Sequence, residues 1–301
     1  MSILVAGGTG IVGGATVRLL RERDEAVSVL VRGGERHPKA APLRELGVTI
    51  IDGDITDPDS LARATEDVDV VICTVTSMPT NADDGLRRVD REGTLALIDA
   101  AAAANVDRFV YVSYSGNLRE ASPLETAKRD CERRLTAGNV STVILRPSFF
   151  MEVWLSPALG FDAMGGTARI YGTGDARVSY VSARNVADFA AAAATRRYPG
   201  RHTVIEIGGP EAISQHDAVR VFERVLGHTI QVQQLPLEAI AAQRQTDDPL
   251  KQSFGALMTA YAKGDVIDGA SAVAEQHGVE LRSVEDYARD VASGAAGAAH
   301  G

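Results

Sequence analysis

Closely spaced glycines follow the first apolar run of the chain, residues 3–6. From Gly7 to residue 14 the sequence reads Gly-Gly-Thr-Gly-Ile-Val-Gly-Gly. Where a strand turns sharply into a helix, free backbone N–H groups and the positive end of the helix dipole face a pyrophosphate, and glycine leaves room because it has no Cβ. This spacing predicts a dinucleotide site, with a glycine-rich turn that binds no ligand as the alternative. The residues expected at the pyrophosphate are Gly7, Thr9, Gly10, Ile11, Val12 and Gly13.

A guanidinium follows the second expected strand, residues 27–31, at the position that selects between the two nicotinamide dinucleotides. An acidic side chain there pairs with the ribose 2′-OH of NAD and repels the 2′-phosphate of NADP. This chain has Arg32, with Arg36 and Lys39 nearby, and these side chains can donate charge-assisted hydrogen bonds to a phosphate. We therefore expect NADP(H) rather than NAD(H). The alternative is solvated surface charge, with Glu35 pairing with one of these cations.

Residues after the third and fourth expected strands extend the nucleotide site. Asp54, followed by Ile55, is placed to accept a hydrogen bond from the adenine amino group or, alternatively, to cap the next helix. Thr74, Val75 and Thr76 end the fourth strand. In a parallel sheet this position lies alongside the adenosine ribose and the nicotinamide half of the cofactor.

Strand and helix patterns alternate through the first half of the chain. The expected strands are 3–6, 27–31, 48–51, 68–74, 109–113 and 142–145, and the expected helices are 11–23, from 58, 85–104 and 125–135. This alternation predicts βαβ units. The expected fold class is α/β, a Rossmann-type doubly wound parallel sheet with a smaller C-terminal substrate-binding cap.

The alternation becomes irregular after residue 147, and this change suggests the domain boundaries. We expect residues 1–150 to form the NADP(H)-binding Rossmann domain, with its sheet completed within 176–208 by strands at 178–181 and 204–207. Residues 151–293 are expected to form a discontinuous cap, and residues 294–301 a frayed tail. Helices are expected at 187–195, near 254–262, and from Ser214, whose N-cap role is indicated by Asp217 three positions later, to near Leu226.

The composition excludes several classes of protein. Lys and Arg number 31 against 40 Asp and Glu, so the net charge of −9 disfavours nucleic-acid backbones and anionic membrane surfaces. Cys73 and Cys131 lie far apart and lack metal-ligand spacing, so we expect no disulfide and no metal site. No basic segment precedes the first apolar run, and no run reaches the roughly 18 apolar residues of a membrane span. We expect a cytoplasmic protein.

Several motifs occur in an order that resembles the atypical short-chain dehydrogenase/reductases, and specifically their NmrA-like branch. Besides the glycine turn these are Gly-Asp-Ile-Thr-Asp-Pro from residue 53, Glu-Gly-Thr from 92, Ile-Asp-Ala-Ala from 98, Arg-Phe-Val-Tyr-Val-Ser from 108 and Leu-Arg-Pro-Ser-Phe-Phe-Met from 145. Gly-Gly-Pro-Glu from 208 and Val-Glu-Asp-Tyr from 284 resemble the C-terminal pattern of extended members. The resemblance covers residue 1 to about residue 290.

The resemblance implies the catalytic groups. The superfamily uses a serine after the fifth strand and a Tyr-x-x-x-Lys motif on the next helix, where tyrosine transfers the proton and lysine holds the nicotinamide ribose. Ser115 matches the serine and Lys128 the lysine, but Leu124 occupies the tyrosine position and cannot exchange a proton. Pro147 and Phe149, in the Leu-Arg-Pro-Ser-Phe motif, are expected beside the cofactor.

The missing tyrosine leaves three mechanisms open. Lys128 can act as acid or base, as in the related isoflavone-reductase-like branch, if burial disfavours its charged form. Alternatively, a quinone or activated alkene can accept hydride and take its proton from water. In the third case the site binds NADP(H) without turnover, as resemblance to NmrA-type redox sensors implies. Tyr114, Tyr171 and Tyr180 are candidate substitutes for the tyrosine, although packing roles are the simpler interpretation.

We expect an NADPH-dependent reductase of a small, fairly apolar carbonyl, quinone or conjugated alkene, acting as a monomer or homodimer. A redox sensor that acts through a protein partner is the alternative, and an isomerase or dehydratase is a third. The expected substrate-lining residues, which can equally be plain core, are Tyr114, Phe149, Phe150, Met151, Trp154, Phe254, Met258 and Tyr261. Neither nucleic acid nor membrane is an expected partner.

Overall fold

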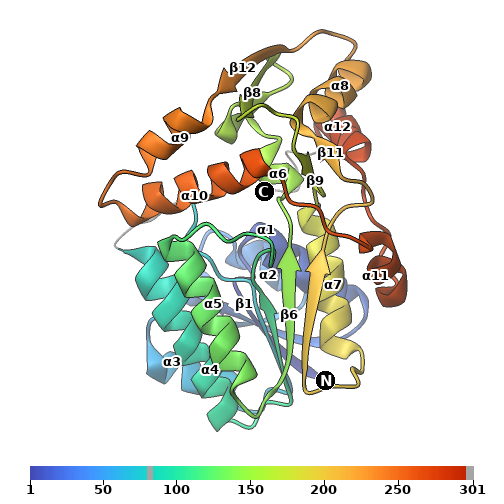
Figure 1. Cartoon of the computed structure of the whole chain (residues 1–301). Helices are drawn as coiled ribbons and strands as arrows, with labels where there is room; N and C mark the ends of the chain where they lie inside the picture. Colours follow the sequence, from blue (N-terminus) through green and yellow to red (C-terminus); the bar gives the residue numbers. More distant parts are fainter. Residues whose placement is uncertain (80–83, 296–301) are drawn as a thin grey trace. The chain divides into compact units, whose positions relative to one another are not determined.

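The computed structural model describes residues 1–79 and 84–295 and divides the chain into two compact units (Figure 1). The first unit comprises Met1–Ser113, Pro123–Arg146 and Ala187–Ile205. The second comprises Tyr114–Ser122, Pro147–Val186 and the chain from Glu206 onward. The segment that contains Ser115 therefore belongs to the second unit, although the expected boundary lies at residue 150.

A seven-stranded sheet forms the frame of the first unit, in the order β10-β6-β5-β4-β1-β2-β3. The strands are β1 (Ser2–Ala6), β2 (Ala26–Val31), β3 (Thr49–Asp52), β4 (Val70–Cys73), β5 (Arg108–Val112), β6 (Ser141–Pro147) and β10 (His202–Ile207). The pairings from β6 to β3 are parallel. The order reverses direction between β1 and β4, which is the position where doubly wound sheets bind their ligands. The predicted α/β, Rossmann-type fold class is confirmed.

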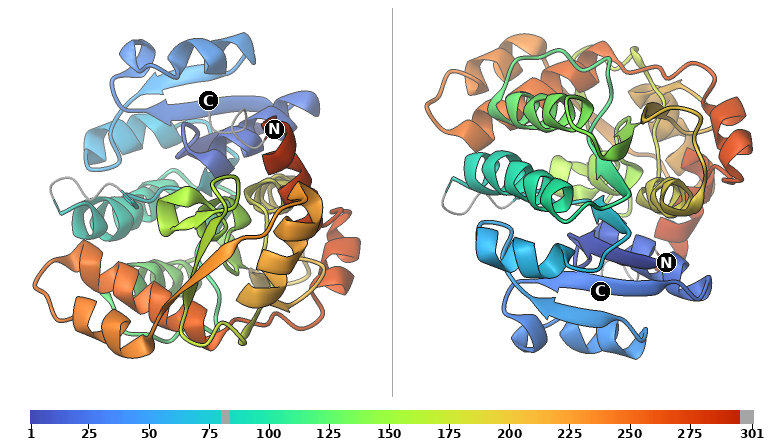
Figure 2. Two further views of the ribbon diagram at one scale, coloured as in Figure 1. Left: turned by 90° about the horizontal axis from the view of Figure 1, so that it is seen from above. Right: turned by 90° about the horizontal axis from the view of Figure 1, so that it is seen from below.

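Helices bury both faces of this sheet. They are α1 (Ile11–Glu22), α2 (Ala40–Glu45), α3 (Pro58–Thr65), α4 (Thr94–Ala103), α5 (Pro123–Thr136) and most of α7 (Ala183–Thr195), with a short 3₁₀ turn at Gly34–Arg36. Apolar residues of α3, α4 and α5 pack with β1, β4 and β5 in one cluster, and Figure 2 shows these helices side by side. Burial on both faces explains why strands such as Ile3–Ala6 are continuously apolar and fully buried.

The helix expected over residues 85–104 begins differently from the prediction. Its first part, Leu86–Gly93, is a π-helix, and only then does α4 continue as an α-helix. The Thr94 backbone N–H donates to the Val89 carbonyl five residues back, which is the π spacing. A Cβ at Gly93 would lie 2.9 Å from the Ile55 carbonyl oxygen, so only glycine fits at the junction.

The second unit contains small sheets and helices around its own core. The strands are β7 (Phe161–Asp162), β8 (Thr167–Tyr171), β9 (Arg177–Val178), β11 (Ile213–Ser214) and β12 (Gln231–Leu235). The helices are α6 (Met151–Trp154), a 3₁₀ turn (Pro157–Leu159), α8 (Gln215–Leu226), α9 (Leu237–Gln243), α10 (Pro249–Lys263), α11 (Ala270–His277) and α12 (Val284–Ser293). The Ser214–Asp217 capping box and the end of α8 at Leu226 confirm that part of the prediction.

The strands expected within 176–208 and the expected C-terminal tail differ in part from the structure. Of the strands expected within 176–208, β10 joins the central sheet beside β6, whereas β9 pairs antiparallel with β11 in a separate two-stranded sheet. Of the strand expected at 178–181, only Val178 lies in β9, while Val178 and Val181 form isolated parallel bridges with Asp265 and Phe150. Of the expected tail, Gly294 closes α12 with φ 75°, and residues 296–301 lie outside the described residues.

Candidate functional site

The glycine turn joins β1 to α1, and its backbone is packed so closely that a side chain has no room at Gly7 or Gly13. Gly7 has φ +91°, a conformation that residues with a side chain rarely adopt. A Cβ on Gly13 would lie 2.2 Å from the Gly7 carbonyl oxygen and 2.6 Å from the Thr74 hydroxyl oxygen. The Gly10 N–H donates to the Gly7 carbonyl at 2.9 Å and closes the turn. The chain therefore reverses within four residues, as the glycine spacing predicts.

The N-terminus of α1 has the properties of an anion site. Its N-cap is Gly10, no side chain caps it, and its first turn holds no acidic residue. The first intrahelical bond runs from the Gly14 N–H to the Gly10 carbonyl at 2.8 Å, so the N–H groups of the first turn point beyond the helix. Gly10 and Ile11 are exposed. Backbone donors, the dipole and the absence of side chains together fit a pyrophosphate.

The basic residues after β2 pair differently from the alternative considered for them. Glu35 pairs with Arg44, and Arg36 lies 3.8 Å from a carboxylate oxygen of Asp52 at the end of β3. The expected pairing of Glu35 with Arg32, Arg36 or Lys39 is therefore wrong, while the choice between a phosphate site and solvated surface charge stays a prediction. Arg32 is exposed and forms no ion pair within residues 1–79 and 84–295, so its guanidinium is available to a phosphate.

Asp54 does not cap the helix that follows it. Its Oδ1 accepts from the Thr56 N–H at 2.9 Å and from the Thr56 hydroxyl at 2.8 Å. The N-cap of α3 is Asp57, whose carboxylate accepts from the Asp59 N–H. The capping alternative is thus wrong, because Asp54 closes its own turn three positions earlier. The contact of Asp54 and its buried neighbour Ile55 with adenine stays a prediction.

The segment after β4 is held by an acid that the sequence analysis missed. Thr74 donates through its N–H to the Ala6 carbonyl at 2.9 Å, next to the glycine turn. Asp90, on the π-helix and 1% exposed, accepts from the Ser77 N–H at 2.8 Å and the Ser77 hydroxyl at 2.6 Å. The Thr76 hydroxyl accepts from the Met78 N–H at 3.2 Å. Residues 74–78 are therefore fixed in place at the reversal point of the sheet.

Lys128 is a buried residue and not a surface lysine. On α5 it is 7% exposed, its Nζ donates to the Val112 carbonyl at 3.1 Å and lies 5.1 Å from the centre of the Tyr111 ring. A buried ammonium needs such partners, and the aromatic face adds a cation–π attraction. Leu124, one helical turn earlier, is also buried, so the tyrosine position holds an apolar side chain.

Three buried groups of the first unit, the thiols of Cys73 and Cys131 and the phenol of Tyr111, do not transfer protons readily. Burial raises the pKa of the Cys131 thiol to about 12 and raises the pKa of the Cys73 thiol and of the Tyr111 phenol as well. Both cysteines are free and fully buried. The two thiols and the phenol therefore stay neutral near pH 7. Separately, the described residues contain no group of His, Cys, Asp and Glu side chains that could hold a metal ion.

Ser115 lies in a buried polar cluster of the second unit. Its hydroxyl donates to Oδ1 of Asp265 at 2.9 Å, and its oxygen accepts from the Asn117 N–H at 3.2 Å. Its own N–H donates to the Pro147 carbonyl at 2.9 Å. Asp265 is 150 positions away in the sequence, so sequence spacing gave no signal for it.

Half of the residues expected to line a substrate site are core residues of the second unit, and the other half are partly buried. Trp154 and Tyr261 are 6% and 2% exposed, with ring centres 4.4 Å apart, and Phe149 lies edge-on to both. Met151 is fully buried in the same cluster. Tyr114 and Met258 pack at its partly buried edge. Phe150 and Phe254 are half-buried.

Two of the three candidate substitute tyrosines are engaged in that core. The Tyr171 hydroxyl donates to the Leu159 carbonyl at 2.8 Å, and the Tyr180 hydroxyl hydrogen-bonds with that of Tyr261. Burial raises the pKa of both Tyr171 and Tyr180. These contacts argue against either phenol as the proton donor, and the packing interpretation holds for both.

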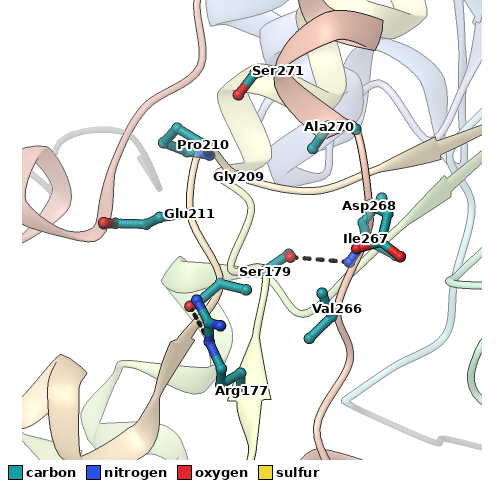
Figure 3. Close-up of a pocket in the computed structure, with 12 residues that line it drawn as sticks. Arg177, Ser179, Gly209, Pro210, Glu211, Val266, Ile267, Asp268, Ala270 and Ser271 are labelled. Atoms are coloured by element: carbon teal, nitrogen blue, oxygen red, sulfur yellow. Dashed lines mark hydrogen bonds between the residues drawn. The ribbon is translucent and has the colours of Figure 1, made fainter.

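A pocket of about 300 Å³ occurs elsewhere in the second unit (Figure 3). Arg177, Ser179, residues 209–212 and residues 266–271 line it. None of the candidate site residues is among them, although Gly209, Pro210 and Glu211 belong to the Gly-Gly-Pro-Glu motif. Two of its polar side chains pair with backbone groups of the lining: Arg177 donates to the Ala212 carbonyl, and Ser179 accepts from the Ile267 N–H.

The model of the NmrA-like family matches residues 1–288 of this chain. The chain belongs to the NmrA-like family. The chain is 31% identical over 252 residues to a photosystem II assembly factor of Synechocystis. The alignment covers 81% of this chain and 73% of that protein. It is 32% identical to the (4-alkanoyl-5-oxo-2,5-dihydrofuran-3-yl)methyl phosphate reductase of Streptomyces griseus, covering 84% of each.

The fold of this NmrA-like chain also matches solved structures. The NADPH-dependent quinone oxidoreductase of Escherichia coli, in complex with NADPH, has a TM-score of 0.75 at 19% identity, over 96% of this chain and 99% of that one. Among the described residues of this chain, no helix is both long and apolar enough to cross a membrane.

Proposed function

We propose that this protein is an NADPH-dependent reductase that passes a hydride to a quinone or another conjugated acceptor. The observation that carries the proposal is the N-terminus of α1, a tight glycine turn with unused backbone donors and no competing acid. The unpaired Arg32 favours NADP(H) over NAD(H). The reductases among the relatives and neighbours, which include an NAD(P)H azoreductase and the quinone oxidoreductase, support this activity.

The residues of the site have separate roles in this proposal. The first turn of α1 binds the pyrophosphate, Arg32 and Arg36 bind the 2′-phosphate, and residues 74–76 line the ribose and nicotinamide. Lys128, held at the Val112 carbonyl, donates to the nicotinamide ribose and contributes positive charge where the acceptor gains negative charge. Bound NADPH supplies the hydride.

Several of the candidate proton donors cannot give a proton, and this favours an acceptor that needs none from the protein, with Tyr114 and Lys128 as the candidates that stay open. Leu124 has no proton to give, Tyr171 and Tyr180 are held in the core, and both thiols have raised pKa values. A quinone or an activated alkene meets this condition because its reduced form is a weak base that water can protonate. Tyr114, Phe150 and Met258 are only partly buried and are the candidates for contact with the acceptor. The role of Ser115 stays what the resemblance implies, because its hydroxyl donates to Asp265. A cytoplasmic location and a monomeric or homodimeric state stay predictions from the sequence.

The experiment mixes purified protein with NADPH and a panel of quinones, enones and simple ketones, and follows the absorbance of the nicotinamide. We expect turnover with quinones or enones and none with unactivated ketones, which need an acid. Tight NADPH binding without turnover across the panel would reject the reductase. That result would favour the redox sensor, and the relatives named as assembly factors support a role without turnover.

A further inference from the structure

An acidic side chain lies beside the basic loop after β2, although that strand itself ends in none. Asp52 is the last residue of β3 and is in register with Val31, the last residue of β2. Neighbouring parallel strands lie about 4.8 Å apart, so Asp52 is one strand spacing from the residue that precedes Arg32. The fold thereby brings a carboxylate to the place where dinucleotide folds recognise the ribose 2′ position.

The two-glycine turn after Arg32 holds the basic loop against Asp52. Gly33 and Gly34 both have positive φ, at 82° and 53°. A Cβ at Gly34 would lie 2.8 Å from Cβ of Asp52 and 2.9 Å from its Cγ, so only glycine permits this approach. The 3₁₀ turn that follows brings Nη2 of Arg36 to 3.8 Å from Oδ2 of Asp52. The backbone of the turn therefore sets the contact between the loop and Asp52.

The other acid of the loop is engaged elsewhere, and this leaves Asp52 as the carboxylate that faces Arg36. Glu35 pairs with Arg44. Over residues 1–79 and 84–295, the ion-pair partner of Arg36 is Asp52. The Arg36 side chain is 84% exposed and that of Asp52 is 61% exposed. An exposed pair of this kind adds little to stability, so the carboxylate is not needed for folding and is accessible to a ligand.

A carboxylate and an arginine at this position act on the two nicotinamide cofactors in opposite senses. The carboxylate accepts a hydrogen bond from the ribose 2′-OH of NADH, whereas it repels the 2′-phosphate of NADPH. A guanidinium donates charge-assisted hydrogen bonds to the phosphate. Because Arg36 also interacts with Asp52, a phosphate that approaches Arg36 has to compete with a carboxylate. The loop therefore has one group suited to each form of the cofactor.

We propose that Asp52 is a specificity-determining residue of the cofactor site, which accepts a hydrogen bond from the 2′-OH of NADH and weakens the binding of NADPH. Arg32 and Arg36 bind the 2′-phosphate, so the site takes both dinucleotides. The inference rests on the proposed function, in which the 2′ position of the cofactor lies at this loop. Asp52 contacts the adenosine ribose and takes no part in hydride transfer. Its contribution is therefore to the Kd of the cofactor and not to kcat at saturating cofactor.

The test measures the Kd of NADPH and of NADH for wild type and for Asp52→Ala by calorimetry. Alanine removes the charge and both acceptor oxygens but keeps Cβ, the Asp52 atom nearest to Gly34. Two unit charges about 4 Å apart change an equilibrium constant about fivefold even in water, so we expect Asp52→Ala to bind NADPH about fivefold more tightly. Loss of the hydrogen bond to the 2′-OH is expected to weaken NADH binding about three- to tenfold.

Asp107→Ala is the matched control, because it removes the same charge from the same unit. Asp107 is exposed and directly precedes β5, so it lies at the amino ends of the strands and not at the carboxyl ends. We expect both of its Kd values to match the wild type. Opposite shifts for the two cofactors identify a specificity role, because a structural defect at Asp52 weakens both.

Each other outcome overturns one of the two proposals. Any result for Asp52→Ala other than a gain for NADPH together with a loss for NADH would overturn the inference, while turnover by the wild type leaves the reductase standing. A wild type that binds neither dinucleotide would overturn the proposed function, and the inference with it.

Discussion

The glycine turn of the first unit lies within residues 7–13, whereas the polar cluster of the second unit joins Ser115 to Asp265 across 150 positions. In the turn, backbone atoms form the site and side chains are excluded from it. In the cluster, side chains form the site, and the backbone serves to bring them together. In the proposed function, cofactor binding therefore depends on residues adjacent in the sequence, whereas the polar cluster depends on the tertiary fold. Substitutions in the two regions should accordingly produce different phenotypes.

The largest effect is expected for Gly13→Ala. The new Cβ would lie 2.2 Å from the Gly7 carbonyl oxygen, so the turn must open. Overpacking of this kind typically costs about 1–3 kcal/mol of stability. It also displaces the N–H groups that the pyrophosphate needs, and we expect NADPH binding to fall more than a hundredfold in a fluorescence titration.

Gly138→Ala is the control for that substitution. The nearest atom to a Cβ at Gly138 lies 3.4 Å away, so the methyl group fits with little adjustment. We expect its NADPH affinity to match the wild type. Equal affinity in Gly13→Ala and Gly138→Ala would contradict the backbone site.

A smaller and more selective effect is expected for Arg32→Ala. Arg32 is exposed and without an ion pair in the described part of the chain, so its loss disturbs no packing. Removal of one charge-assisted hydrogen bond corresponds to about a tenfold weaker affinity. We expect the Kd for NADPH to rise by that factor and the Kd for NADH to stay the same, measured by calorimetry. Arg44→Ala, which breaks the exposed pair with Glu35, should leave both values unchanged, and equal losses for the two cofactors would refute the role of Arg32.

The comparison also explains what the sequence could predict. The glycine turn, the parallel sheet and the Ser214 cap depend on residues within a few positions of each other, and each was predicted correctly. The π-helix was missed because Leu86–Gly93 and α4 share one continuous helical pattern. The sequence could not distinguish whether Trp154 and Tyr261 belong to the core or line a pocket, because aromatic residues occur in both environments. Asp265 and Asp90 are single acids whose partners are brought near only by the fold.

The smallest effect is expected for Ser214→Ala, in a part of the second unit remote in sequence from Ser115. The Ser214 hydrogen bonds, followed by the Arg220 pair, lower the pKa of the Asp217 carboxyl. Loss of an N-cap typically costs about 1 kcal/mol, and we expect a lower Tm with unchanged kcat. Because the folded pKa of Asp217 lies below its unfolded value, its contribution is complete at neutral pH and is lost as the pH falls through the folded value. The Tm difference between Ser214→Ala and wild type should therefore shrink towards low pH, and a difference that grows there would contradict the linkage.

The kcat of Lys128→Ala with NADPH and a quinone tests the central claim most directly. In the proposed function Lys128 is the buried cation at the nicotinamide, and removal of one preorganised electrostatic group costs roughly 10²–10³ in rate. Lys251→Ala, an exposed lysine on α10, is the control. We predict a loss of at least a hundredfold in Lys128→Ala, with NADPH still bound and the control unaffected. Turnover by Lys128→Ala at the wild-type rate would contradict the account.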